Sequence, residues 1–319
     1  MKPTLALLML FVGLPPMIAE VTSFKILPTT TDPQIGRAYD LAHTIYVNRD
    51  IVIEHLPNLP ADRHELLLFL PGTNGSGAGG AGFCELAANL GYHAISLTYD
   101  TGTSAAEACA TDRDPKCFED FRLALIEGGA SKHLTVSRAD SIENRLIKLL
   151  VLLQQRRPRE NWRQFLTEGQ TLKWDAIAVS GQSQGGGHAA LIALRHRVAR
   201  AVCLGAPKDF NKMLDAPAAW YEQPSATSKA LFFTFNHVED HQGCTPAELQ
   251  RNLRALKLTD FGPAVDAATS QYPFNHARIL CTTYPSTKKS KEAHTSVVAT
   301  ANAARWETVW TYMLTEQAP

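Results

Sequence analysis

Short apolar runs alternate with amphipathic stretches along most of this chain. Continuous apolar runs of four to eight residues are typical of strands that are buried on both faces, as in parallel sheets. We expect such strands at 65–70, 92–97, 175–179, 201–204, 230–235 and 277–283. Two less regular segments, 24–27 and 43–48, are expected to add antiparallel strands at the edge of the sheet.

Helices are predicted between these strands, at 82–90, 141–155 and 185–194. The second has apolar residues at helical spacing and is followed by Pro158. A further helix should open at Thr245, with Pro246 at its first position and Glu248 at its third. The last helix carries Trp306, Val309, Trp310 and Met313 on its inner face. Alternation of strands and helices predicts a three-layer α/β sandwich with a mostly parallel central sheet.

No internal repeat and no low-complexity linker divides the 319 residues, so we expect one domain over 20–319. Inserts are expected near 100–136 and 206–228. The second contains several large apolar residues, namely Phe210, Met213, Leu214, Trp220 and Tyr221. These residues suit either a small lid with an acyl-pocket wall or the core side of a short helix.

The first 19 residues resemble an export signal. Lys2 is followed by a mostly apolar run over residues 5–14, which is shorter than a membrane span requires. Cleavage after Ala19 would produce a mature chain from residue 20, and an uncleaved anchor or a buried first strand is the alternative. We therefore expect an exported protein, periplasmic or extracellular, with no integral membrane association.

The charge balance points away from nucleic acid as a partner. The chain has 31 basic and 31 acidic residues, a formal net charge of +0. The basic run at 288–291 is interpreted as a solvated loop.

Six cysteines in an exported chain permit up to three disulfides. Cys109 and Cys117 flank a short polar loop and are the first pair that we expect. Cys244 and Cys281 are the second, because both should flank the active site, whereas Cys84 and Cys203 lie in apolar surroundings. The spacings are not those of a zinc site, so no structural metal is expected.

Residues 179–187 carry the pattern Gly-x-Ser-x-Gly between a predicted strand and a predicted helix. A strand that turns abruptly into a helix forces its central residue into strained backbone angles and requires tiny neighbours two positions away. Gly181 and Gly185 are those neighbours, and Ser183 is the central residue. This setting predicts that Ser183 is a nucleophile at the positive end of a helix.

With this motif in place, the chain resembles the α/β-hydrolase superfamily over roughly residues 60–315. The wording Gly-Gln-Ser-Gln-Gly-Gly also resembles cutinase-like enzymes and secreted lipases or depolymerases. The resemblance implies a three-layer α/β-hydrolase sandwich. It also implies that an acid and a histidine follow the serine, each in a loop beyond a strand end.

By this resemblance Asp240, beyond the strand at 230–235, is the supporting acid. Glu239 and Asp209 are its competitors, because some hydrolases place the acid on the earlier strand. His294, in the loop before the last helix, is the base. Of the other histidines, His188 is expected to pack on the helix after the nucleophile, His237 and His241 to line the pocket, and His276 to lie on the surface.

The same resemblance implies an oxyanion hole with two backbone donors. One is the N–H of Gln184, and the other belongs to the turn at 71–77, with Thr73 as the expected residue. Other members carry His-Gly where this chain has Pro71-Gly72, which leaves the second donor open.

These residues predict an exported serine hydrolase that acts on small or polymeric carboxylic esters through an acyl-enzyme, with no cofactor and no metal. A peptidase or amidase on the same triad, a lyase, and a non-catalytic ligand-binding protein with this fold are the alternatives.

Overall fold

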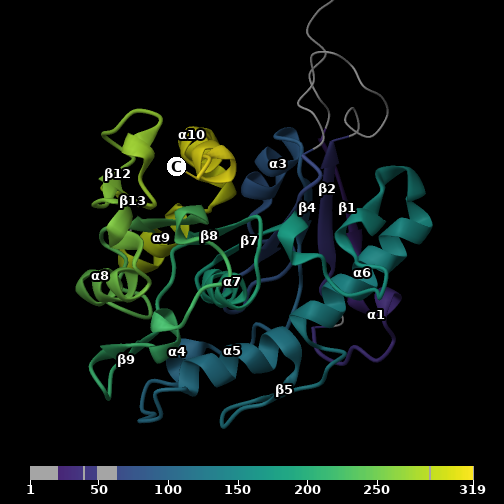
Figure 1. The fold of residues 1–319 in the computed structure, drawn as a ribbon, viewed down its shortest axis with the longest axis horizontal. Coiled ribbons are helices and arrows are strands. Elements are labelled where there is room, and N and C mark those ends of the chain that lie inside the picture. The colour runs from purple at the N-terminus through teal and green to yellow at the C-terminus, as the bar shows by residue number, and fades with distance from the viewer. Residues whose placement is uncertain (1–20, 39, 49–62, 287–288, 319) are drawn as a thin grey trace, which may run out of the picture.

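A nine-stranded sheet forms the centre of the molecule in the computed structural model, which describes residues 21–38, 40–48, 63–286 and 289–318 (Figure 1). The expected export signal lies outside these residues. In spatial order the strands are β1 (Val21–Ile26), β2 (His43–Asn48), β4 (His93–Ser96), β3 (Leu66–Leu70), β7 (Ile177–Gln182), β8 (Arg200–Leu204), β11 (Phe232–His237), β13 (Ile279–Thr282) and β12 (Val265–Asp266).

The sheet is mixed, with its antiparallel part at one edge. From β4 to β12 every neighbouring pair of strands is parallel, whereas β2 runs antiparallel to both β1 and β4. Leu68 of β3 faces Ile95 of β4 and Val179 of β7 in this register. The predicted strands and the antiparallel edge are confirmed, and the two-residue strand β12 is an addition that no apolar run announces.

Helices cover both faces of the sheet, and this gives the three layers. The α-helices are α1 (Pro28–Thr31), α3 (Ala81–Asn89), α4 (Ala105–Ala108), α5 (Cys117–Glu127), α6 (Ile142–Arg156), α7 (Gln184–Arg195), α8 (Pro246–Ala255), α9 (Lys289–Ser296) and α10 (Ala303–Thr315). The 3-10 helices are η1 (Pro158–Glu160), η2 (Trp162–Phe165), η3 (Trp174–Ala176), η4 (Ala219–Glu222), η5 (Lys229–Leu231), η6 (Leu258–Phe261), η7 (Phe274–His276) and η8 (Thr300–Asn302).

The core is divided by the sheet into two apolar clusters. Successive side chains of a strand point to opposite faces, so Leu68 of β3 belongs to one cluster and Phe69 to the other. The Phe69 cluster contains residues of α3 and α10, and the rings of Phe83 and Trp310 meet edge to face at 5.7 Å. Helices α5, α6 and α7 pack on the opposite face, as Figure 1 shows.

Helix caps follow the signals in the sequence. The Ser141 hydroxyl accepts from the N–H of Asn144 at the start of α6. Thr245 and Glu248 form a capping box at the start of α8, with Pro246 at the first position. These caps satisfy backbone N–H groups that have no acceptor within their helices.

The segment 100–136 is more regular than expected. It contains α4, the buried helix α5 and a small hairpin of β5 (Gly129–Ala130) and β6 (Thr135–Val136). The apolar residues of α5, such as Phe121 and Leu125, lie in the core. Acidic residues in its first turn, Glu119 and Asp120, interrupt the apolar pattern that would have announced this helix.

The segment 206–228 packs largely against the core. It forms a hairpin of β9 (Phe210–Asn211) and β10 (Ala216–Pro217), followed by η4. Trp220 and Tyr221 are buried, whereas Met213 and Leu214 at the hairpin tip are exposed. The aromatic residues therefore support the core interpretation of this segment.

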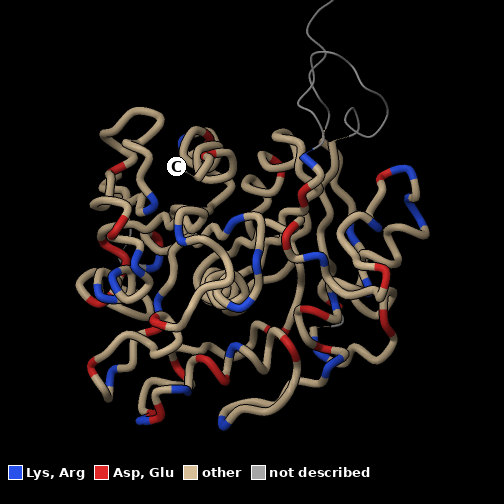
Figure 2. The backbone as a smooth tube through the Cα atoms, viewed as in Figure 1, with Lys and Arg blue, Asp and Glu red and all other residues tan. Residues whose placement is uncertain are grey.

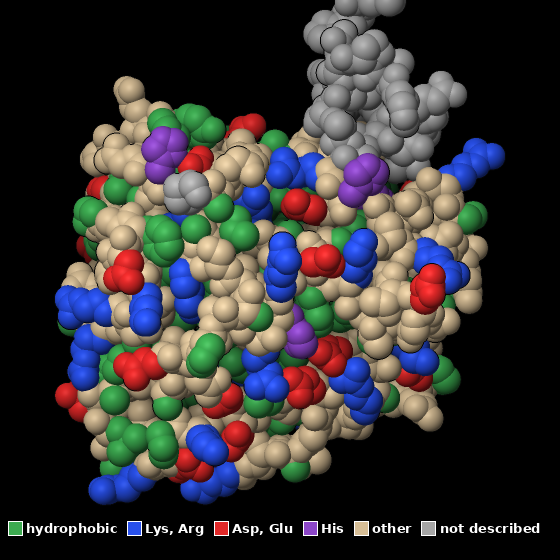
Figure 3. Space-filling view, viewed as in Figure 1, with side chains coloured by type: hydrophobic (Ala, Val, Ile, Leu, Met, Phe, Trp, Pro, Cys, Tyr) green, Lys and Arg blue, Asp and Glu red, His purple; other side chains and the backbone are tan. Residues whose placement is uncertain are grey.

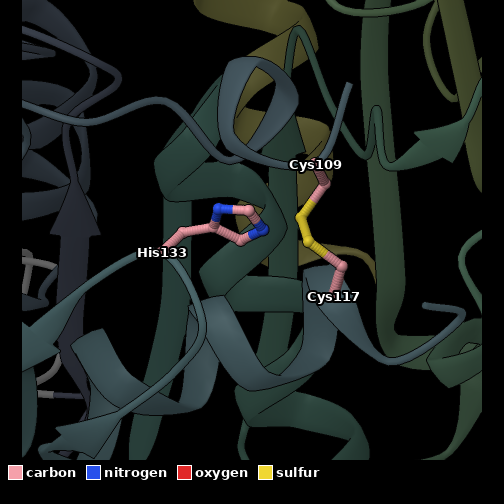
Figure 4. Close-up of side chains that lie close together, drawn as sticks. All are labelled: Cys109, Cys117 and His133. Atoms are coloured by element: carbon pink, nitrogen blue, oxygen red, sulfur yellow. A yellow bond between two sulfur atoms is a disulfide. The ribbon is translucent and has the colours of Figure 1, made fainter. Parts of the chain in front are cut away.

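Cys109 and Cys117 form a disulfide at the junction between α4 and α5, as expected (Figure 4). The expected pair of Cys244 and Cys281 is wrong, because both are free thiols. Cys244 lies in the core just before α8, whereas Cys281 lies inside β13, opposite Asn236 of β11. A shared proximity to the active site therefore did not bring the two sulfurs together.

Loss of the disulfide is expected to lower the free energy of unfolding by about 2.5 kcal/mol, because closing so short a loop restricts the unfolded chain only moderately. Urea unfolding of the Cys109→Ser/Cys117→Ser variant should give the same midpoint as the reduced wild type. Mass mapping of unreduced wild type should find the two residues joined. Two free thiols at these positions would refute the pairing.

Candidate active site

Ser183 lies at the sharp turn between β7 and α7. Its backbone angles are φ 56° and ψ −119°, a region that non-glycine residues rarely adopt. The turn is held by two backbone hydrogen bonds, from the N–H of Ser183 to Leu204 O at 2.8 Å and from the N–H of Gly187 to Ser183 O at 3.1 Å. Such strain persists where the surroundings enforce it, and it occurs frequently at active sites.

The glycines on either side of Ser183 are required by backbone contacts. A Cβ at Gly181 would lie 2.4 Å from the carbonyl carbon of Gly185. A Cβ at Gly185 would lie 1.9 Å from the oxygen of Leu70, at the end of β3. Neither position has room for a side chain, so both glycines have the structural role that the motif predicts.

Replacing Gly185 by alanine is therefore expected to lower the free energy of unfolding by about 3 kcal/mol, because backbone must move to admit the methyl group. Gly169→Ala is the matched control, since the nearest atom to its Cβ would be 3.9 Å away. Urea unfolding of both variants is the measurement. Equal midpoints for the two would contradict the packing argument.

The turn after β3 approaches Ser183 from the other side. A Cβ on Gly72 would lie 3.1 Å from the Cβ of Ser183, and Thr73 is the next residue of this turn. Within the described residues, the N–H of Thr73 has no hydrogen-bond acceptor. Gln184 is the first residue of α7, so its N–H has no acceptor within the helix. These are the two N–H groups that were expected to form the oxyanion hole.

The side chain of Gln184 is fixed by the segment that leads into α4. Its Nε2 donates to Thr103 O at 3.0 Å, and its Oε1 accepts from the N–H of Ala105 at 2.9 Å. The hydroxyl of Thr73 also donates to Oε1, at 3.3 Å. The side chain of Gln184 thus joins the two proposed oxyanion residues to the segment before α4, a contact that sequence reasoning missed.

His294 and Asp240 meet beside this turn. His294 Nδ1 donates to Asp240 Oδ2 at 2.7 Å, and both side chains are buried. The imidazole packs against Gly205, where an added Cβ would lie 3.3 Å from His294 Cε1. Gly205 directly follows Leu204, the residue that accepts the backbone hydrogen bond of Ser183. Gly205 thus links the pair of His294 and Asp240 to the backbone beside Ser183. His294 was expected in a loop, but it lies in α9.

Lys208 also contacts Asp240. Lys208 Nζ lies 2.6 Å from Asp240 Oδ2, and the N–H of Gln242 donates to Oδ1 at 2.9 Å. Burial by itself would raise the pKa of Asp240, but the hydrogen bond from His294 and the charge of Lys208 hold it below its usual range. The carboxyl group is therefore ionised, as a partner of histidine requires.

The competing acid Asp209 is engaged elsewhere. Its carboxylate binds Arg122 of α5 through two hydrogen bonds, from Nε at 2.6 Å and from Nη2 at 2.5 Å, and accepts a third from Trp220 Nε1 at 3.1 Å. Arg122 also donates to Gln184 O at 2.8 Å. This buried ion pair therefore contacts the first residue of α7 through Arg122.

Glu239, the other competitor, has an exposed side chain and accepts a hydrogen bond from the Ser286 hydroxyl at 3.2 Å. Since neither competitor contacts His294, Asp240 is the candidate acid that does so in the structure.

The remaining histidines have other partners. His188 is buried on α7 near Arg122, and desolvation lowers its pKa well below the usual value. His237 donates from Nε2 to Tyr284 O at 2.7 Å, so its ring is held by the loop after β13. His276 lies at the surface, 2.7 Å from Glu316.

A cluster of potential metal ligands is formed by Cys109, Cys117 and His133 (Figure 4). The two sulfurs are bonded to each other, and His133 Nε2 lies 2.8 Å from Asp112. The cysteines are thus not free thiolates, the form in which cysteine binds metals.

None of the helices in the described ranges has the length and apolar composition needed to cross a bilayer.

Basic and acidic side chains are interspersed on the face in Figure 3, and Figure 2 shows the same mixture along the outer helices and loops. Nothing on this face resembles the single-sign patch that binds nucleic acid.

The arrangement described above is that of the α/β-hydrolase fold: a mostly parallel sheet covered on both faces, with a serine at a sharp strand-to-helix turn. No family model matches the chain, and no curated protein matches it either.

Solved structures similar to the chain include three of bacterial proteins. The first is TT1662 from Thermus thermophilus, at 14% identity and a TM-score of 0.44, covering 93% of this chain and 100% of the other. The second is a protein assigned to the dienelactone hydrolases from Klebsiella pneumoniae, at 10% and 0.42, covering 92% and 98%. The third is FphF, a fluorophosphonate-binding serine hydrolase from Staphylococcus aureus, at 12% and 0.47, covering 93% and 99%.

Proposed function

We propose that the protein is a serine hydrolase that cleaves carboxylic esters through Ser183, His294 and Asp240. The observation that carries the proposal is the buried hydrogen bond between His294 and Asp240, beside a serine held in strained backbone angles at the start of α7. These are the residue types and the chain order that nucleophilic catalysis by serine uses in this fold.

In the proposed reaction, Ser183 Oγ attacks the acyl carbon while His294 takes its proton. Asp240 holds the Nδ1–H tautomer of the imidazole and stabilises its charged form. The backbone N–H groups of Thr73 and Gln184 would bind the developing oxyanion, each contributing about 3 kcal/mol. The protonated histidine then gives its proton to the departing alcohol, and water attacks the acyl-enzyme with His294 as the base again.

An ester is the proposed substrate because an alcohol leaves more easily than an amine. Matched p-nitrophenyl esters and p-nitroanilides of increasing acyl length test this directly. Turnover of the esters at least about a hundredfold faster than that of the anilides is expected. Comparable rates on both would instead indicate a peptidase or amidase on the same residues, and turnover of neither would favour a non-catalytic ligand-binding protein.

We further propose that the protein works outside the cytoplasm. The short apolar segment after Lys2 supports export, and so does the Cys109–Cys117 disulfide, because disulfides persist mainly in oxidising compartments. The mass of the protein recovered from its native compartment tests this. A chain that still carries residues 1–19 and reduced cysteines would contradict the proposal.

A further inference from the structure

The ammonium group of Lys208 lies directly against the proposed triad. Lys208 belongs to the loop after β8, and its side chain is 8% exposed. Its Nζ is 2.6 Å from Asp240 Oδ2, the same oxygen that accepts from His294 Nδ1 at 2.7 Å. One carboxylate oxygen therefore lies between two basic groups.

The surrounding backbone holds Lys208 in this position. Its Nζ donates a second hydrogen bond to Gln242 O at 2.9 Å, while the N–H of Gln242 binds the other oxygen of Asp240 at 2.9 Å. Gly243, with φ +76°, lies against the lysine stem, and a Cβ there would be 3.6 Å from the Cβ of Lys208. The turn at 240–243 thus contacts both the lysine side chain and the carboxylate.

We infer that Lys208 is a positioning residue of the triad, which fixes the Asp240 carboxylate and opposes the formation of a second positive charge on His294. The inference rests on the proposed function. A buried carboxylate requires a compensating cation, and here Lys208 supplies it while the imidazole is neutral. When His294 takes the proton of Ser183, two positive charges share one carboxylate oxygen, so the imidazolium returns its proton readily to the leaving group.

Other ionisable groups lie near the pair of Lys208 and Asp240, and several of them bind other residues. His237 binds Tyr284 O, Glu239 binds Ser286, and Asp209 binds Arg122. On the elements and loops packed against the pair, the further ionisable groups are Cys244, Glu248, Lys212, Asp266, Cys281, His241, Lys291 and Glu292. Among the described residues, Lys208 is the lysine or arginine in contact with Asp240.

Removal of the ammonium group is expected to shift the acid limb of the kcat/KM profile to higher pH. In Lys208→Met the carboxylate keeps its charge without a cation, so His294 is protonated more easily and the active fraction falls at a higher pH. Lys208 Nζ and His294 Nδ1 lie 2.6 and 2.7 Å from the same oxygen of Asp240, so repulsion between their positive charges predicts a shift of about one pH unit or more. Lys208→Arg retains the charge and should keep the midpoint within about 0.3 unit of wild type.

The experiment measures kcat/KM for p-nitrophenyl acetate against pH in wild type, Lys208→Met, Lys208→Gln and Lys208→Arg. Lys212→Met is the control, because Lys212 is a nearby, partly exposed lysine that pairs with Glu248 instead of Asp240. Its midpoint should equal that of wild type. Rates are normalised to the folded fraction at each pH, and Lys208→Gln replaces Lys208→Met if Lys208→Met folds poorly.

An unshifted midpoint in Lys208→Met and Lys208→Gln would overturn the inference and leave only a packing role. A shift in Lys208→Arg as large as that in Lys208→Met would overturn it too, because charge would not be the cause. Absence of turnover in wild type would overturn the proposed function itself, and the role of Lys208 with it. The two failures are thus distinguished by the wild-type rate.

Discussion

Replacement of Ser183 by alanine is expected to reduce kcat for p-nitrophenyl acetate by about 10⁴-fold or more, because no other group would form the acyl-enzyme. The folded structure should survive, since alanine keeps the Cβ that the strained angles already accommodate. Turnover and urea unfolding, measured on the same preparation, separate the loss of chemistry from a loss of fold.

Ser180→Ala is the matched control for this variant. Ser180 lies on β7 three residues before the proposed nucleophile, and its hydroxyl donates to Leu68 O at 3.1 Å. Its loss should cost about 1 kcal/mol of stability and leave kcat within about threefold of wild type. Retention of wild-type turnover in Ser183→Ala would show that the nucleophile lies elsewhere.

The second large effect separates the two candidate acids. Asp240→Asn is expected to lower kcat by about 10³- to 10⁴-fold per folded molecule, because the amide cannot stabilise the imidazolium or hold the required tautomer. Asp209→Asn should instead leave kcat per folded molecule within about tenfold of wild type. Its main effect should be a loss of about 3–5 kcal/mol of stability, because Arg122 remains buried without its partner.

Both variants are compared by kcat normalised to the folded fraction from circular dichroism. This normalisation matters because Asp240→Asn also deprives Lys208 of its partner and is itself destabilised. A severe loss of kcat in Asp209→Asn together with a mild one in Asp240→Asn would show that Asp209, in the loop after β8, is the supporting acid.

The parts of the fold with a strong local signal were predictable from the sequence. Buried parallel strands such as β3 and β7 are continuous apolar runs, and the turn at Ser183 requires glycine on both sides. His294 and Asp240 could be proposed only by resemblance, since their partnership depends on how α9 meets the distant loop after β11.

Side-chain contacts between distant segments were not predictable. Three examples are the pairing of Lys208 with Asp240, the pairing of Arg122 with Asp209, and the hydrogen bonds of the Gln184 side chain. Each joins segments far apart in the chain, and no repeating sequence pattern marks them. The expected bond between Cys244 and Cys281 failed for the same reason, because closeness to one site does not specify the direction of two side chains. Sequence patterns indicate elements, while side-chain partners depend on the assembled fold.

The role of Ser183 as the nucleophile is tested most directly by labelling the purified protein with a fluorophosphonate, followed by peptide mass mapping. We expect one equivalent of label per folded chain, located on Ser183, with turnover lost in proportion to labelling and no label in Ser183→Ala. Label on a different residue, or full turnover in a protein with Ser183 labelled, would contradict it.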